Sequence, residues 1–151
     1  MLNLIMIIGK NNGSEIIYSK NHEIIVQSSS LSSLQVVLEI GKQFYRPAFA
    51  TMELIGKLNG YHQKVPFMIE SNRLLLFPTT GLKDKKCCWI NYYSVKKSKR
   101  LNYGTEISFH DYSIIKCVDI NFKYYLPIDS RTIFNQMYRC KVVHEQYLKN
   151  K

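Results

Sequence analysis

Short runs of apolar and β-branched residues, each ended by polar turn residues, recur along this chain and limit its fold most strongly. Residues 15–19 and 23–27 are two such runs, separated by the polar sequence Lys-Asn-His. Residues 65–69 and 73–77 form a second pair around Glu-Ser-Asn. Runs of this length on either side of a short polar turn are typical of antiparallel strands. The sequence therefore predicts two pairs of neighbouring strands.

Further strands are predicted before and after these pairs. The apolar residues 1–10 are expected to form a buried strand. Residues 105–109 and 113–117 flank His110-Asp-Tyr112, which predicts a third hairpin with His110 and Asp111 as solvated residues at its tip. Strands are also expected at 87–95 and 122–126. The sheet that these strands form is predicted to be antiparallel.

The segment from residue 34 to residue 57 has apolar residues at helical spacing. Pro47 interrupts this pattern, so the segment predicts either two helices or one broken helix, with Pro47 in the first turn of the second piece. Proline is tolerated there because the first turn of a helix does not use its N–H group. Gly56 and Gly60 are expected to close the second helix.

Residues 130–148 show the clearest helical pattern, and Asp129 or Ser130 is expected to cap its start. One side of this helix is predicted to pack against the protein through Ile133, Phe134, Met137, Cys140, Val143, Tyr147 and Leu148. The other side, free to contact a partner, carries Arg131, Asn135 and Arg139. The predicted fold is a single α+β domain over residues 1–151, with a mainly antiparallel sheet, helical segments around 34–57 and a C-terminal helix at 130–148.

The charge of the chain is strongly positive and unevenly distributed. The 21 Lys and Arg residues against 11 Asp and Glu residues give a net charge of +10. Residues 1–75 contain 7 basic and 5 acidic residues, whereas residues 76–151 contain 14 and 6. A field of this kind attracts polyanions, so nucleic acid or an anionic membrane surface is the expected class of partner.

Basic residues are densest between residues 83 and 100, where seven of them accompany one aspartate and several aromatic residues. Basic groups mixed with aromatic rings can contact phosphates and stack on bases, which favours nucleic acid as the partner. The alternative interpretation is a pair of solvated turns beside an ordinary strand.

Sequence patterns of enzymes and cofactor sites are missing. The chain has no Gly-x-Gly-x-x-Gly, no Gly-x-x-x-x-Gly-Lys-Ser/Thr and no Gly-x-Ser-x-Gly. Its four histidines stand singly, and the only adjacent pair of candidate groups is His110 with Asp111. We therefore expect no catalytic residues, no cofactor, no metal site and no small-molecule substrate, and the protein is predicted not to be an enzyme.

The cysteines are predicted to be free thiols in a reducing compartment; they are Cys87, Cys88, Cys117 and Cys140. Adjacent residues of a strand point to opposite faces, so at most one of Cys87 and Cys88 is expected to share a core with Cys117 or Cys140. The opening apolar run lacks a basic region and a cleavage site, and it is shorter than the roughly 20 residues that span a bilayer. We expect a cytoplasmic protein, nucleoid-associated when bound to DNA, with no membrane contact.

Five segments carry a family resemblance. They are Leu-Asn-Gly-Tyr-His-Gln-Lys-Val-Pro-Phe-Met-Ile at 58–69, Leu-Phe-Pro-Thr at 76–79, Cys-Trp-Ile at 88–90, Gly-Thr-Glu-Ile-Ser-Phe at 104–109 and Asn-Gln-Met-Tyr-Arg at 135–139. In order and approximate spacing they resemble the competence transcription factor family, ComK, and in particular its short staphylococcal-type members. Weaker similarity extends back toward residues 12–15.

The resemblance implies a transcription activator of DNA-uptake and recombination genes. Such an activator binds double-stranded DNA at paired AT-rich promoter boxes, mainly through the minor groove, as a homo-oligomer. Minor-groove recognition of A·T pairs uses Arg, Lys, Asn and Gln together with the width of the groove, so it needs no helix-turn-helix. The residues predicted to contact DNA are Arg46, Arg73, Lys96, Lys97, Lys99, Arg100, Arg131, Asn135 and Arg139. Trp89, Phe77 and Pro78 are expected in the core or in turns, and Gln136 is expected either to read base edges or to pair with buried backbone.

Two departures from the ComK pattern support an alternative. Residues 44–51 read Phe-Tyr-Arg-Pro-Ala-Phe-Ala-Thr where the family has a stretch with Gly, Ser and Arg, and Arg46 is expected to replace that arginine. Longer relatives carry a tail beyond the final helix for control by an adaptor and Clp protease, and the printed sequence stops at Lys151, so this control stays open. The alternative is a basic protein-interaction module that modulates a longer ComK-type activator without sequence-specific DNA binding.

Overall fold

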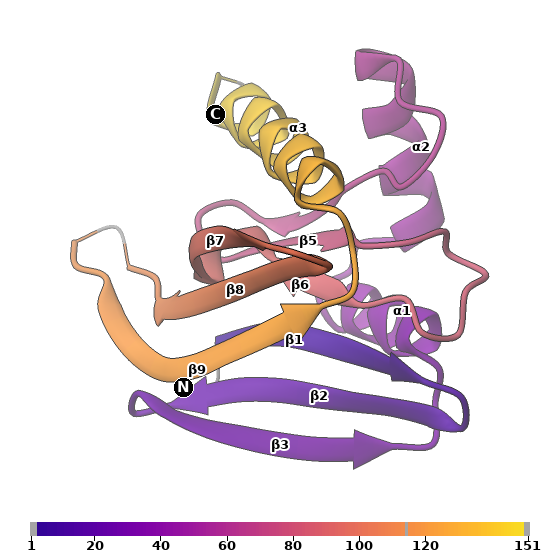
Figure 1. Ribbon diagram of the computed structural model, residues 1–151. Coiled ribbons are helices and arrows are strands. Elements are labelled where there is room, and N and C mark those ends of the chain that lie inside the picture. Colours follow the sequence, from indigo (N-terminus) through magenta and orange to yellow (C-terminus); the bar gives the residue numbers. More distant parts are fainter. Residues whose placement is uncertain (1–2, 114, 150–151) are drawn as a thin grey trace.

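The larger of two antiparallel sheets lies at the centre of the protein (Figure 1). The structure is a computed structural model that describes residues 3–113 and 115–149. The six strands of this sheet are β1 (Asn3–Lys10), β2 (Gly13–Lys20), β3 (Glu23–Ser29), β4 (Phe67–Glu70), β5 (Leu74–Pro78) and β6 (Trp89–Asn91). Their order is β3-β2-β1-β6-β5-β4, and every neighbouring pair is antiparallel. The predicted strand pairs β2–β3 and β4–β5 and the buried opening strand are confirmed.

The smaller sheet contains the strands β7 (Val95–Leu101), β8 (Gly104–Asp111) and β9 (Val118–Leu126), in that order. A short 3₁₀ helix, η1 (Tyr92–Ser94), leads from β6 into β7. The chain thus passes directly from the larger sheet into the smaller one. The expected strand at 122–126 is confirmed and begins four residues earlier.

The predicted hairpin around residues 110–112 is wrong. Strand β8 continues to Asp111, and its partner there is β9 instead of residues 113–117, which form no strand where the structure describes them; Ile114 lies outside the described residues. Asp111 is buried, accepts a hydrogen bond from the hydroxyl of Ser19, and has its Oδ2 2.7 Å from Nδ1 of His22. Contacts with the distant β2–β3 hairpin therefore hold Asp111 inside the protein.

The segment that Pro47 interrupts forms two separate helices, the first of the two predicted alternatives. They are α1 (Ser33–Gln43) and α2 (Ala48–Asn59). Ser32 caps α1 by accepting a hydrogen bond from the N–H of Gln35, whose side chain accepts one from the N–H of Ser32. Pro47 stands immediately before α2 as its cap residue, so it lies one position outside the predicted first turn.

Of the two glycines that were expected to close α2, only one lies at the end of the helix. Gly60 ends α2 as expected, with φ of 73°, a left-handed conformation that glycine adopts without strain. Gly56 lies inside the helix, where a Cβ would approach the carbonyl oxygen of Tyr61 to 2.7 Å. Close packing against the chain that follows α2 explains the glycine at this position. None of the described helices has an apolar stretch long enough to cross a membrane.

Buried side chains cover both faces of the larger sheet and divide the core in two. Ile7 and Trp89 belong to the cluster that includes Val37 of α1 and Met52 of α2. The opposite cluster joins the larger sheet to the smaller sheet and to the C-terminal helix α3 (Ser130–Lys149), for example through Phe109. Figure 1 shows α1 and α2 on one side and β7–β9 with α3 on the other.

The cysteines follow this division. Cys87 and Cys88 are both buried, but in different clusters, and Cys88 shares its cluster with Cys140 of α3. Cys117 is exposed. The predicted limit of one shared core for the adjacent pair is therefore confirmed, although both residues lie just before β6 and not in a strand.

Helix α3 packs with a slightly different face from the predicted one. Ile133, Cys140 and Val143 are buried as expected, but Phe134 is 69% exposed and Gln136 is buried in its place. The helix contacts β5, β7 and β8, and this combination of neighbours decides which side turns inward. The predicted α+β domain with a C-terminal helix is confirmed.

Candidate nucleic-acid interface

Strand β7 presents the densest row of cations in the protein. Lys96, Lys97, Lys99 and Arg100 are all exposed, and β7 is an edge strand of the smaller sheet. Neighbouring residues in a strand point to opposite faces. Lys97 and Lys99 pair with Ser108 and Glu106 on the outer face, whereas Arg100 pairs with the buried Thr105.

The outer face of the smaller sheet forms a lysine hollow of about 280 Å³. Its cationic lining consists of Lys96, Lys97, Lys99 and Lys123. Two carboxylates share it: Lys96 Nζ lies 2.6 Å from Asp119 Oδ2, and Lys123 Nζ lies 4.0 Å from Glu106 Oε1. In the part of the chain that the structure describes, Lys97 and Lys99 form no ion pair, so both remain available to an anionic partner.

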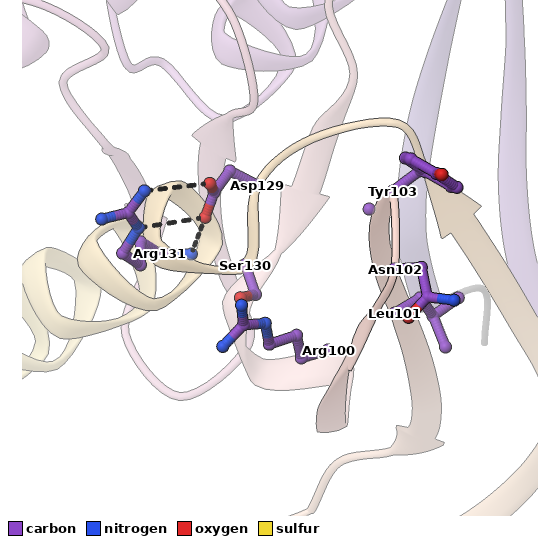
Figure 2. Close-up of a pocket in the computed structure, with 8 residues that line it drawn as sticks. Arg100, Leu101, Asn102, Tyr103, Asp129, Ser130 and Arg131 are labelled. Carbon is purple, nitrogen blue, oxygen red and sulfur yellow. Dashed lines mark hydrogen bonds and ion pairs between the residues drawn. The ribbon is translucent and has the colours of Figure 1, made fainter.

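The strand also contributes to a second cavity, the arginine hollow, where the β7–β8 turn approaches the start of α3 (Figure 2). This hollow has a volume of about 460 Å³ and is lined by Arg100, Leu101, Asn102, Tyr103, Gly104, Asp129, Ser130 and Arg131. Arg100 and Arg131 are 31 positions apart in the sequence and meet only because β7 and α3 are neighbours. We call the lysine hollow and the arginine hollow together the β7 surface.

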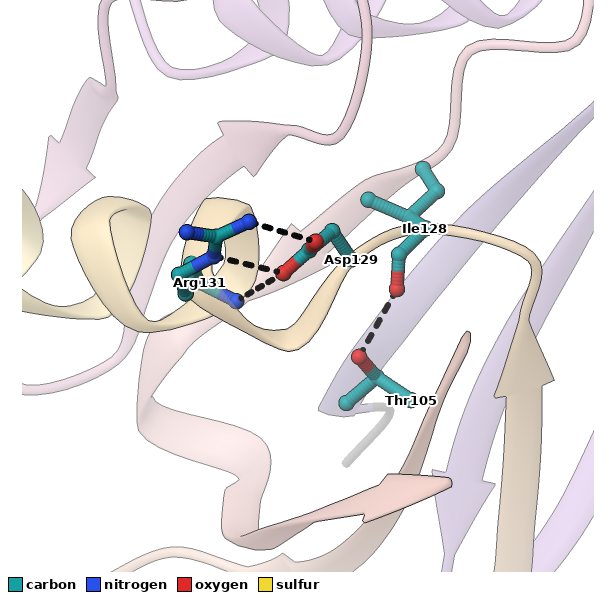
Figure 3. A network of polar contacts seen from close by, with 4 residues as sticks. All are labelled: Thr105, Ile128, Asp129 and Arg131. Carbon is teal, nitrogen blue, oxygen red and sulfur yellow. Dashed lines mark hydrogen bonds and ion pairs between the residues drawn. The ribbon is translucent and has the colours of Figure 1, made fainter. Parts of the chain in front are cut away.

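Asp129 fixes the start of α3, as predicted. Its Oδ1 accepts a 2.8 Å hydrogen bond from the N–H of Arg131, and its Oδ2 lies 3.4 Å from the guanidinium of the same residue (Figure 3). The hydrogen bond from the Arg131 backbone and then the one from its side chain lower the pKa of Asp129. Thr105 donates a 2.8 Å hydrogen bond to the carbonyl oxygen of Ile128, which ties the approach to α3 to β8. The two sides of the arginine hollow are thereby held together.

The outward side of α3 carries Arg131 and Asn135 together with two exposed aromatic residues, Phe134 and Tyr138. Arg139, predicted to join this row, is turned into contacts within the protein. Its Nη1 donates a 2.6 Å hydrogen bond to the carbonyl oxygen of Gln63.

Gln136 serves the buried backbone, in agreement with the second of its two predicted roles. Its Nε2 donates to the carbonyl oxygens of Lys64, at 2.9 Å, and Pro78, at 2.7 Å. An amide group with two buried acceptors has no donor left for a base edge.

The other predicted contacts lie apart from the β7 surface. Arg46 is exposed in the connection between α1 and α2. Arg73 is exposed at the β4–β5 turn, where its Nη1 lies 3.6 Å from Glu70 Oε1, and it lines a different hollow, beside α1. Neither residue lines the lysine hollow or the arginine hollow.

Sequence reasoning missed several residues of the β7 surface, among them Lys123 and Tyr103. Lys123 reaches the lysine hollow from β9, and Tyr103 lines the arginine hollow from the β7–β8 turn. For Lys123 the alternation of β9 was the available signal, since it is exposed between the half-buried Phe122 and Tyr124.

Ser19, His22 and Asp111 lie together but lack the order of a serine, histidine and aspartate catalytic site. Ser19 and His22 both contact the carboxylate of Asp111, so the serine hydroxyl donates to the carboxylate and not to the imidazole. A serine nucleophile needs the imidazole between these two groups. Within residues 3–113 and 115–149, no three His, Cys, Asp or Glu residues gather as metal ligands would.

Burial also keeps two cysteine thiols protonated. It raises the pKa of Cys88 to about 11 and raises that of Cys140 well above its ordinary value. Thiolate is the nucleophilic and metal-binding form of cysteine, so these two residues are inert near neutral pH.

Comparison with known protein families assigns the chain to one of them. The family model described as ComK protein matches residues 4–150, nearly the whole chain. The chain belongs to the ComK family. ComK is a family of competence transcription factors and not of enzymes, and the chain is accordingly a competence-related transcription regulator by family. No curated protein and no solved structure matched the chain.

The ComK segments of this chain turn out to contact one another. Phe77 and Pro78 of the 76–79 segment pair with Ile90 and Trp89 of the 88–90 segment in the centre of the larger sheet. The 58–69 segment is joined to the 135–139 segment through Gln136 and Arg139. These ComK motifs therefore stabilise the fold, and Trp89, Phe77 and Pro78 are buried as predicted.

Proposed function

We propose that this chain is a DNA-binding transcription activator of competence genes and that the β7 surface is its DNA-binding interface. The observation that carries the proposal is that β7 contributes cations to both hollows: Lys97 and Lys99 line the lysine hollow, and Arg100 lines the arginine hollow together with Arg131 of α3. Exposed cations at this density neutralise phosphates and release condensed counterions, which supplies affinity for duplex DNA. The family supports transcription regulation as the purpose of that binding.

The proposed target is AT-rich promoter DNA, contacted mainly in the minor groove. The narrow minor groove of A-tracts concentrates negative potential, which favours inserted Lys and Arg side chains. The β7 surface offers such side chains on two strands and at the start of α3, together with the amides of Asn102 and Asn121, and amides suit the acceptor groups of A·T pairs. Arg46, Arg73 and Arg139 remain predicted DNA contacts of secondary rank.

We further propose that the protein acts in the cytoplasm, associates with the nucleoid when bound, and occupies paired boxes as a homo-oligomer. Two-fold symmetry of a protein assembly matches a duplicated DNA site, because each copy can contact one box in the same way.

A titration of fluorescent duplexes tests the proposal. At about 150 mM salt, an AT-box duplex should bind at least about 10³-fold more tightly than a GC-rich duplex of equal length, as specific DNA-binding proteins do. The variant K20A/K42A/K57A is the control for loss of positive charge in general. It removes exposed cations from β2, α1 and α2, outside the β7 surface. It should bind like the wild-type chain, apart from a small uniform loss.

A second candidate function rests on the segment that departs from the ComK pattern. Tyr45 and Phe49, in and beside the α1–α2 connection, are 94% and 55% exposed. Exposed aromatic residues favour contacts with another protein. In that case the chain modulates a longer ComK-type activator, and the titration above would give equal affinities for the two duplexes.

A further inference from the structure

Tyr103 is the side chain of the arginine hollow that the proposed phosphate contacts leave unused. It stands in the tight β7–β8 turn and is 89% exposed. Moving a ring of this size out of water lowers the free energy. A ring left exposed at the edge of a cationic hollow is therefore a candidate contact for a partner. Figure 2 shows Tyr103 across the hollow from Arg131.

The turn that carries Tyr103 is firmly held. The hydroxyl of Tyr125 in β9 donates a 2.9 Å hydrogen bond to the carbonyl oxygen of Tyr103. The next residue is Gly104, at which a Cβ would collide with the carbonyl oxygen of Leu126. These backbone contacts position the turn without using the Tyr103 ring. The ring is therefore presented to solvent by a rigid support.

The groups around the ring match the two ends of a nucleotide. The guanidinium groups of Arg100 and Arg131 suit a phosphate, to which arginine can make two parallel hydrogen bonds. An aromatic ring beside them suits the flat face of a base, which stacks irrespective of its identity. A purely apolar partner would leave Arg100, which has no ion pair among the described residues, without a counter-charge, whereas Arg131 already pairs with Asp129.

We propose that Tyr103 stacks on a base of the bound DNA while Arg100 and Arg131 hold a neighbouring phosphate. This inference rests on the proposed function and names the contact by which the β7 surface engages the bases. Stacking in a duplex requires a base step to open, and TA steps open more easily than most. The contact would therefore favour AT-rich sites without reading individual base edges.

Binding and base unstacking are measured together on AT-box duplexes in which 2-aminopurine replaces one adenine at a time. The wild-type chain should raise the fluorescence of the probe at one position of the box. Y103A should abolish this rise and weaken binding by about 10-fold or more, in line with the effect of removing a base-stacking ring. Y103F should retain both properties. Y45A removes a ring that is 94% exposed outside the β7 surface, and it should behave like the wild-type chain.

The outcomes separate the two proposals. If the wild-type chain does not distinguish the AT-box duplex from the GC-rich duplex, the proposed function is rejected, and the stacking contact with it. If the wild-type chain binds selectively and Y103A binds equally well with the same fluorescence, only the stacking contact is rejected. Selective binding with no fluorescence rise at any position of the box also rejects the stacking contact alone.

Discussion

The guanidinium of Arg139 lies 4.3 Å from the ring centroid of Tyr61, so a cation of α3 rests on the chain that connects α2 with β4. The same guanidinium donates a 2.6 Å hydrogen bond to the carbonyl oxygen of Gln63. At partly exposed positions such as these, a cation–π contact and a hydrogen bond from a charged group together contribute on the order of 1–3 kcal/mol. Arg139 therefore stabilises the fold, a role that its position in a basic, partner-facing row did not indicate.

R139A should lower the free energy of unfolding by about 1–3 kcal/mol, because both contacts are lost. R139K should lose less, since lysine keeps the charge but lacks the planar group. Urea denaturation followed by circular dichroism measures both values. Unchanged stability of R139A combined with weaker DNA binding would instead assign the residue to the DNA interface.

Q136A should be more damaging than its polar character suggests. It leaves the buried carbonyl oxygen of Pro78 and the partly buried one of Lys64 without a donor, and an unpaired buried group costs about 1–3 kcal/mol. The free energy of unfolding, again from urea denaturation, should fall by about 2–4 kcal/mol. The neighbouring N135A alters an exposed side chain and is the control, expected within about 0.5 kcal/mol of wild type.

K96A/K97A/K99A/R100A should weaken binding to every duplex and flatten the dependence of affinity on salt. Each phosphate contact contributes about 0.9 to the log–log slope, so four lost contacts reduce the slope by roughly 3–4. Thermal stability should change little, because exposed charges contribute little to folding. An unfolded quadruple variant would show that the cations of β7 are structural.

Thiol reactivity should distinguish one cysteine from the other three. Cys117 is exposed, whereas Cys87, Cys88 and Cys140 are buried and burial raises their pKa values. At pH 8 the native protein should react with a thiol reagent at one site quickly, and at three more only after denaturation. Fast labelling of two or more sites in the native protein would contradict the buried positions of the adjacent pair.

Stability should decline in alkaline solution. Burial raises the pKa of Cys88 to about 11 and that of Tyr93 to about 12, from ordinary values of 9.0 and 10.0. Below about pH 9 both groups are protonated in the folded and unfolded states, so they do not make the free energy of unfolding depend on pH. As the pH rises further, the unfolded chain loses these protons first, so the free energy of unfolding falls. C88A should have a shallower decline between pH 9 and 11 than the wild-type chain.

Local patterns predicted the elements whose partners are close in sequence. The β2–β3 and β4–β5 pairs and the two helices around Pro47 follow from residues within about 30 positions of one another. The hairpin at 110–112 failed because β8 extends to Asp111, whose contacts with Ser19 and His22 cross about 90 positions. A β-branched run at 113–117 resembles a strand locally, but pairing with β9 decides the structure.

The candidate interface, like the fold, was predictable from the sequence only in part. The sequence alone determined that the cations concentrate in the second half of the chain, that β7 is rich in them, and that α3 has one packed side. Only the tertiary structure decided that Arg100 and Arg131 share a hollow, that Lys123 of β9 lines the lysine hollow, and that Arg139 is turned toward Tyr61. The physical reason is that composition and periodicity describe single elements, whereas the distance between two charges on different elements is set by how those elements pack.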